Sequence, residues 1–131
     1  MPVRATVSKE LAALFGVLGN PHRVRLVEEL REAEVDVNGL QRALGISHSS
    51  VSQHLAVLRA HRIVTERREG RHVYYRLTQS ELAEWVRTGL DFIERDLNQE
   101  LEIRSAVEQV RVIWSPGSVD SEESIAVAKG S

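Results

Sequence analysis

The hydrophobic pattern of the first thirty residues predicts two helices. Ser8 is a suitable N-cap, Gly19 is a suitable stop, and the apolar side chains between them recur at helical spacing: Leu11, Leu14, Phe15 and Leu18. Asn20 and Pro21 form a typical helix start, because asparagine caps a helix and proline is tolerated at the first helical position. The second helix has one apolar side, formed by Val24, Val27 and Leu30.

The next segment predicts a short helix, a tight turn and a further helix. A helix over Val37–Leu44 ends at Gly45, which can adopt the left-handed conformation that the turn requires, and Ser47 caps the helix that follows. That helix has an inward apolar face spaced i, i+4 and i+7, formed by Val51, Leu55 and Leu58. Its opposite face is polar without any acidic group, and it consists of His48, Ser49, Ser52, Gln53 and Arg59.

After Arg62 the hydrophobic period changes to two, which predicts a β-hairpin. The strands are Ile63–Arg68 and His72–Leu77, with Glu69–Arg71 as the turn. In the second strand Tyr74 and Arg76 are expected to face outward, and three side chains inward: Val73, Tyr75 and Leu77.

A long helical pattern begins at Ser80, and its apolar stripe is too long for so small a core. The stripe is spaced 4, 4, 3, 4 and 4 residues, through Leu82, Val86, Leu90, Ile93, Leu97 and Leu101. At about 1.5 Å per residue it covers about 30 Å, a length that a second copy of the chain would cover most economically. We therefore expect a homodimer whose interface comes from the first and the last helix: Leu11, Leu14, Phe15, Leu18, Leu82, Trp85, Val86, Leu90, Ile93 and Leu97.

These patterns predict one folded domain over residues 8–114. Residues 1–7 are expected to form an N-terminal arm. The stretch from Val107 to Trp114 either extends the last helix or forms a short element of its own. Residues 115–131, rich in serine and acidic residues, are predicted to be a disordered tail.

Composition narrows the functional classes. The chain has 131 residues, of which 42% are hydrophobic and 27% charged, and no apolar run approaches the length of a membrane helix. Met1–Glu10 contains no secretory signal pattern, so a cytoplasmic protein without membrane association is expected. The absence of cysteine excludes disulfides, thiolate metal sites, catalytic thiols and thiol-based redox sensing.

The net charge of −2 hides a strong asymmetry along the chain. Residues 1–46 are neutral, residues 47–79 carry +4 and four of the five histidines, and residues 80–131 carry −6. A basic middle segment favours contact with a polyanion. A chance solvated patch is the alternative that charge alone leaves open.

The order of these elements indicates a winged helix-turn-helix. A helix whose outer face bears hydroxyl and amide groups fits the DNA major groove, where such groups reach base edges without carboxylate repulsion. The hairpin then supplies guanidinium groups to flanking phosphates or to the minor groove, from Arg67, Arg68, Arg71 and Arg76. The partner predicted by this order is double-stranded DNA.

Three motifs resemble the arsenic-repressor (ArsR) family of bacterial winged-helix regulators. They are GNPHRVRL at Gly19–Leu26, ISHSSVSQHL at Ile46–Leu55 and RREGRHVYYRL at Arg67–Leu77, within a resemblance that runs from about Leu11 to Leu97. The resemblance implies a mainly α fold with a hairpin wing, ordered as four helices, two strands and a fifth helix. It also implies a homodimer that represses transcription from an inverted-repeat operator and leaves when an inducer binds. Ser49, Ser52 and Gln53 fall where family members touch the major groove, and Arg71 where the wing reaches the backbone or minor groove.

The sensing residues of that family do not carry over. Asp36 and Asn38 stand where the resemblance would place a thiolate pair. The other common metal site of the family maps onto Gln79, Glu81, Phe92 and Arg95, of which Glu81 alone has a metal-binding side chain. We expect no metal and no cofactor, and the identity of the inducer stays open.

Several alternatives remain beside the repressor. One is a winged-helix module that binds another protein through its acidic last helix. Another is a sensor with a small organic inducer, for which Trp85 and Phe92 form the wall of an apolar pocket between subunits rather than dimer core. A metal site could use the four clustered histidines, for which hydrogen bonding or phosphate contact is the competing role: His48, His54, His61 and His72. An enzyme with Ser49 or Ser52 as nucleophile and His54 as base lacks an acid, an oxyanion hole and a nucleophile elbow.

Overall fold

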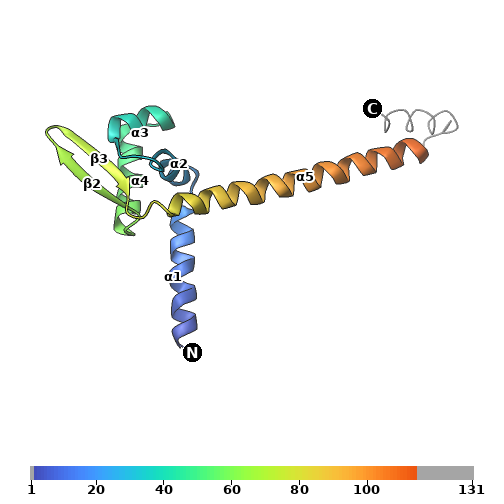
Figure 1. Ribbon diagram of the computed structural model, residues 1–131, viewed down its shortest axis with the longest axis horizontal. Coiled ribbons are helices and arrows are strands. Elements are labelled where there is room, and N and C mark those ends of the chain that lie inside the picture. Colours follow the sequence, from blue (N-terminus) through green and yellow to red (C-terminus); the bar gives the residue numbers. More distant parts are fainter. Residues whose placement is uncertain (1, 115–131) are drawn as a thin grey trace. The chain divides into compact units, whose positions relative to one another are not determined.

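A computed structural model describes residues 2–114, which fall into two units divided between Thr88 and Gly89 (Figure 1). The first unit contains α1 (Pro2–Leu18), α2 (Pro21–Glu29), β1 (Val35–Asp36), α3 (Val37–Leu44), α4 (His48–Ala60), β2 (Val64–Glu69), β3 (His72–Leu77) and the start of α5. Helix α5 runs from Leu82 to Trp114, so its residues from Gly89 onward belong to the second unit. The predicted fold class, mainly helical with a hairpin wing, is confirmed. The predicted tail, 115–131, lies outside the described residues.

The core of the first unit is built by α1, α2, α3, α4 and the sheet. Its buried side chains are Val17, Leu26, Val27, Leu30, Leu40, Val51, Leu55, Leu58, Ile63, Val64 and Leu77. The predicted inward face of α4 is confirmed, since Val51, Leu55 and Leu58 are all at most 1% exposed. Packing of this face fixes which side of α4 is left for solvent or a partner.

The sheet has three strands rather than the two that the sequence predicts. Its order is β1-β3-β2 and both pairings are antiparallel, with Val35 opposite Tyr75. Strand β1 was missed because two residues are too short to show an alternating pattern. Strand β2 begins at Val64 instead of Ile63, and the hairpin turns at Gly70, whose φ of 61° suits glycine.

The predicted start of the first helix at Ser8 is wrong, because α1 already begins at Pro2. Residues 2–7, expected to form an arm, are therefore its first turns. Proline fits the first turn of a helix, and the hydroxyl of Thr6 donates to the carbonyl of Pro2 at 2.7 Å. Ser8 lies inside the helix, where an exposed serine costs only a fraction of a kcal/mol, about 0.5, relative to alanine.

The other predicted helix caps are confirmed. The side chain of Asn20 accepts hydrogen bonds from the amides of His22 and Arg23 at 3.0 and 3.3 Å. Ser47 accepts from the amide of Ser50 at 3.1 Å, and Gly45 ends α3 in the left-handed conformation with a φ of 67°. These caps set the tight turn between α3 and α4.

The apolar residues expected in a dimer interface fall into two groups. Four of them pack against the core of their own chain and are half-buried: Leu14, Leu18, Leu82 and Val86. The other six are exposed: Leu11, Phe15, Trp85, Leu90, Ile93 and Leu97. Phe15 and Trp85 have ring centroids 6.3 Å apart.

Within the second unit, residues 89–114 form one helix with no buried side chain. The stretch from Val107 to Trp114 continues α5, which decides between the two alternatives that the sequence left open. At 3.6 residues per turn, Ile103, Val107, Val110 and Trp114 share a face about a third of a turn away from the face of Leu90, Ile93 and Leu97. No helix among residues 2–114 is both long and apolar enough to cross a bilayer.

Candidate nucleic-acid interface

The outer face of α4 presents hydrogen-bonding side chains that no described residue occupies. His48, Ser49 and Gln53 are exposed, and Ser52 is half-buried at the hollow beside the wing. The hydroxyl of Ser47 is engaged in the cap, where it also donates to the hydroxyl of Ser50 at 2.9 Å. The side chains of Ser49, Ser52 and Gln53 are thus left to bind an external group.

Arg59, also on the outer face of α4, is already bound by the carboxylate of Glu66. The carboxylate of Glu66 lies 3.0 Å from Nη1 of Arg59 and accepts a hydrogen bond from the hydroxyl of Tyr75, also at 3.0 Å. Burial raises the pKa of the Tyr75 hydroxyl, and its hydrogen bond to Glu66 acts in the same direction. Arg59 therefore fixes the end of α4 to the sheet.

Arg67 is held even more firmly. Its guanidinium donates to both carboxylate oxygens of Glu34, lies 2.6 Å from Glu69, and sits 4.8 Å from the centroid of the Tyr74 ring. Hydrogen bonding from Arg67 is the main cause that lowers the pKa of Glu34. The positive charges of Arg67 and Arg76 lower this pKa further. The contact with Arg67 also explains why Tyr74, expected to face outward, is half-buried.

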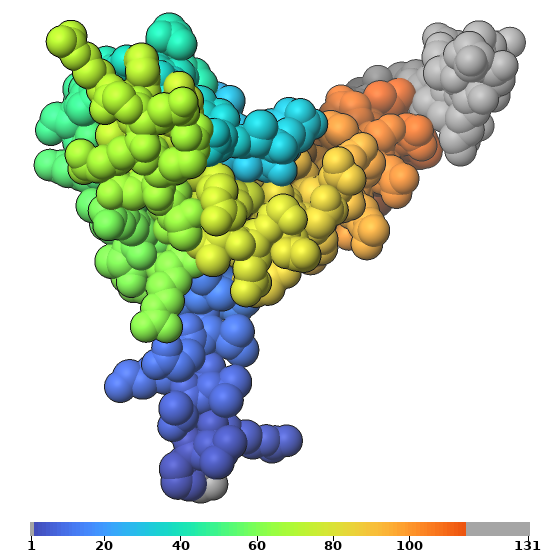
Figure 2. Space-filling model, turned by 60° about the vertical axis from the view of Figure 1, so that its left-hand side comes forward, coloured from blue at the N-terminus to red at the C-terminus, as the bar shows by residue number. Residues whose placement is uncertain are grey.

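The remaining wing arginines are available to a ligand. Arg71 and Arg76 are exposed, and neither forms an ion pair with a residue in 2–114. Arg68 has 76% of its side chain exposed and lies 4.0 Å from Glu66. Figure 2 shows the hairpin, in yellow-green, projecting beside the turquoise surface of α3 and the green surface of α4.

A hollow of about 220 Å³ separates the first turns of α4 from the wing. It is lined by Asp36, Val37, Asn38, His48, Ser52, Glu66, Arg68, Arg71, His72, Val73 and Tyr75. The start of α3 was not predicted as part of this site. Asp36 caps α3 through a 2.9 Å hydrogen bond from the amide of Gly39 and lies 3.6 Å from Nδ1 of His72. The capping pattern was visible in the sequence, but its position beside the wing follows from the pairing of β1 with β3.

The histidines do not converge on a metal. His54 is half-buried, with Nδ1 at 3.4 Å from Nη1 of Arg23 and its ring 5.3 Å from the ring of His22. Burial lowers the pKa of His54, and the charges of Arg23 and His22 lower it further. Nδ1 of His61 bonds the carbonyl of Val57 at 3.0 Å. Within residues 2–114 no group of three histidine or acidic side chains is arranged to hold a metal ion.

Comparison with known proteins gives a consistent result. The sequence model described as "Bacterial regulatory protein, arsR family" matches residues 20–66. A transcriptional repressor SmtB homolog from Synechocystis is 36% identical over 87 residues, which span 66% of this chain and 66%, slightly less than two thirds, of that protein.

Two solved structures extend the likeness to the fold. The crystal structure of the transcriptional repressor BigR from Xylella fastidiosa is 36% identical, with a TM-score of 0.60 and coverage of 66% of this chain and 89% of that one. A homodimeric winged helix-turn-helix DNA-binding domain from Mycobacterium bovis, 24% identical, has a TM-score of 0.62 and coverage of 70% and 84%. The first unit thus has the fold of winged-helix regulators.

Proposed function

Because the chain belongs to the arsR family of bacterial regulatory proteins, we propose that it is a homodimeric transcriptional repressor that binds double-stranded DNA at an inverted repeat. The observation that carries this proposal is the outer face of α4. It offers hydroxyl and amide groups that no described residue occupies, has no carboxylate, and shares a hollow with Arg68 and with Arg71, which forms no ion pair within residues 2–114. Such a surface fits a base edge flanked by phosphates.

The contacts within the site support two different proposed roles, base or phosphate contact for some residues and positioning of the DNA-binding elements for others. Ser49, Ser52 and Gln53 are proposed to meet base edges in the major groove, and His48 a phosphate near the start of α4. Arg68, Arg71 and Arg76 are proposed to neutralise phosphates beside the wing. Arg59 and Arg67, first expected to touch DNA, are instead proposed to position α4 and the wing, since carboxylates already bind both.

The proposed dimer uses the exposed apolar residues of α1 and α5. The related domain from Mycobacterium bovis is described as homodimeric, which supports this assembly. A two-fold dimer would present two copies of α4 to successive major grooves, so operator half-sites would lie about 34–36 Å apart.

The proposed repressor does not sense thiophilic metals or oxidants. Soft metal ions, arsenite and reactive oxygen or sulfur species act on thiolates, and the sequence contains no cysteine. Its single methionine is Met1. The signal is therefore an organic ligand or another non-thiol input, or occupancy is set by protein concentration alone.

The test is a selection of bound sequences from a random duplex pool, followed by salt titration of variants on the selected site. Gln53→Ala should cost about 1–3 kcal/mol on the preferred site with little change on random DNA. Arg71→Ala should weaken binding to both and reduce the salt slope by about one unit, whereas Arg67→Ala should leave the slope unchanged.

Arg104→Ala, a substitution of an exposed arginine in the second unit, is the matched control and should match the wild type. If Gln53→Ala leaves sequence preference intact, α4 is not the reading helix. If the wild-type chain selects no sequence at all, the protein-interaction alternative replaces the repressor.

A further inference from the structure

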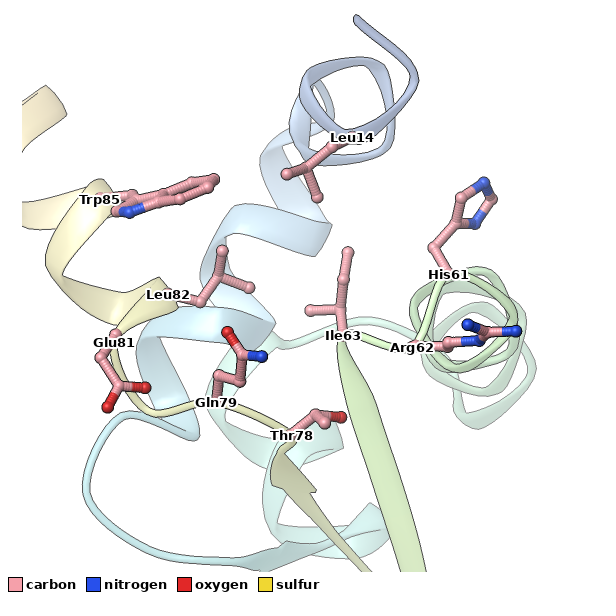
Figure 3. A pocket seen from close by; sticks show the side chains of 9 residues that line it. All are labelled: Leu14, His61, Arg62, Ile63, Thr78, Gln79, Glu81, Leu82 and Trp85. Atoms are coloured by element: carbon pink, nitrogen blue, oxygen red, sulfur yellow. The ribbon is translucent and has the colours of Figure 1, made fainter. Parts of the chain in front are cut away.

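The first unit contains a cavity of about 180 Å³ where four of its segments meet (Figure 3). Its lining residues come from α1, the link between α4 and β2, the link between β3 and α5, and the start of α5: Leu14, His61, Arg62, Ile63, Thr78, Gln79, Glu81, Leu82 and Trp85. It is separate from the hollow beside the wing and shares no lining residue with it.

The centre of this cavity is apolar, and the neutral polar groups of its lining are the amide of Gln79, the hydroxyl of Thr78 and the imidazole of His61. In Figure 3 the side chains of Leu14, Ile63, Leu82 and Trp85 converge, and the amide of Gln79 points toward them from below. The side chains of Arg62 and Glu81 point away, so the charged groups stay at the rim. Gln79 is an exposed residue, and its side-chain amide forms no hydrogen bond with a residue in 2–114.

We propose that this cavity is an effector site for a small neutral molecule with one aromatic ring and an amide-type hydrogen-bonding substituent. An apolar cavity of roughly 150 Å³ accommodates benzene, so the volume suits one ring with one substituent. The ring packs on the indole of Trp85 and on Leu82, and the substituent pairs with the amide of Gln79. A charged ligand is disfavoured because no opposite charge points inward to compensate for its loss of water.

The cavity lies at the base of the wing, so a bound ligand can change the position of the DNA-binding elements. This effector role rests on the proposed function. Ile63 follows Arg62, whose φ of 60° reverses the chain between α4 and β2. The carbonyl of Ile63 accepts a hydrogen bond from the amide of Thr78 at 2.9 Å, which joins the base of the wing at the cavity wall. A ligand packed between Ile63 and Trp85 therefore touches the base of the wing and α5 at once, and filling the space favours one spacing between them.

The test uses the full chain with Trp114→Phe, which leaves Trp85 as its one tryptophan, and benzamide as the probe. Titration should change the fluorescence of Trp85 saturably, with one benzamide per chain and high-micromolar to millimolar affinity by calorimetry. Gln79→Leu should weaken benzamide binding at least tenfold while toluene, which lacks the amide, binds as before. Gln99→Leu makes the same substitution in the second unit and should not change either affinity.

Two results would overturn the site: no saturable binding of benzamide, or equal affinity in Gln79→Leu. Saturable binding that appears only in an Ile93→Asp variant would also overturn it, because the cavity would then be covered by the second copy in the dimer.

The effector role is tested separately with the selected operator. Benzamide should shift operator affinity at least threefold in the wild type and not in Gln79→Leu. Binding of benzamide without any shift would overturn the effector role. Failure of the ligand-free chain to bind the operator would instead overturn the proposed function, while the cavity measurements, made without DNA, would stand.

Discussion

Helix α4 and the second-unit part of α5 have similarly regular apolar stripes and opposite environments. In α4 the stripe is fully packed, with Val51 and Leu58 at 0% exposure and Leu55 at 1%. In residues 89–114 no side chain is buried, and Leu90 and Leu97 are 59% and 51% exposed. The packed inner face holds α4 in place, so its outer face is free to bind a partner. A helix without packing is marginal in water, so the stripe in α5 is expected to be stabilised by a partner surface.

The largest effect is expected where the packing is tightest. Leu55→Ala should lower the free energy of unfolding of the chain by about 3 kcal/mol, because it removes buried methyl groups and leaves a cavity. Urea unfolding followed by circular dichroism measures this. Val112→Ala, on the second-unit helix where no side chain is buried, should cost less than about 0.5 kcal/mol. Equal costs for the two variants would remove the distinction between the helices.

The next effect concerns association rather than folding. Ile93 is 55% exposed in the single chain, so Ile93→Asp should leave the first unit folded but place a carboxylate in the proposed dimer interface. The dissociation constant of the dimer should rise at least about a hundredfold, as measured by sedimentation equilibrium. Arg95→Asp introduces the same side chain on the opposite side of the helix and should have little effect. A wild-type chain that sediments as a monomer at micromolar concentration contradicts the proposed dimer.

The smallest effect is a pH dependence carried by His54. Its folded pKa lies below the ordinary value of 6.5, so the unfolded chain binds a proton that the folded chain excludes. Its stabilising contribution is present above the unfolded pKa and is lost as the pH falls through and below it. His54→Gln should therefore lose less stability between about pH 7.5 and about pH 5.5 than the wild type. His48→Gln, on the exposed outer face, is the control, and an equal loss in His54→Gln would exclude His54 as the source.

Most of the fold could be predicted from the sequence because its helices are amphipathic and capped. The turn at Gly45 and the inward face of α4 follow from local rules that need no knowledge of the rest of the chain. Strand β1 could not be predicted in this way. Its two residues are a strand solely because β3 supplies their partners, and β3 lies far along the chain.

The candidate site was predictable in its residue types but not in its pairings. The sequence shows basic and hydroxyl side chains in the right order, yet it cannot show that Glu34 and Glu66 engage Arg67 and Arg59. Those carboxylates come from a link before β1 and from β2, and they reach the arginines only after the sheet forms. The cavity beside Trp85 was not predicted: the pocket that the sequence suggested lay between subunits and used Phe92, which does not line the observed cavity. Segments far apart in the sequence have to meet to form it.

The short strand β1 also has a consequence for the order in which the chain folds. Its pairing with β3 joins Val35 to Tyr75, about forty residues apart, whereas β2 and β3 pair through a tight turn. Closing the longer loop has the greater entropy cost, and that cost is offset only when α3 and α4 inside the loop have already condensed. The wing is therefore expected to gain its third strand late in folding, so pulse-labelled amides of β1 should become protected after those of the hairpin. During synthesis, β1 could then join the sheet beside α4 only after Tyr75 has been added to the chain.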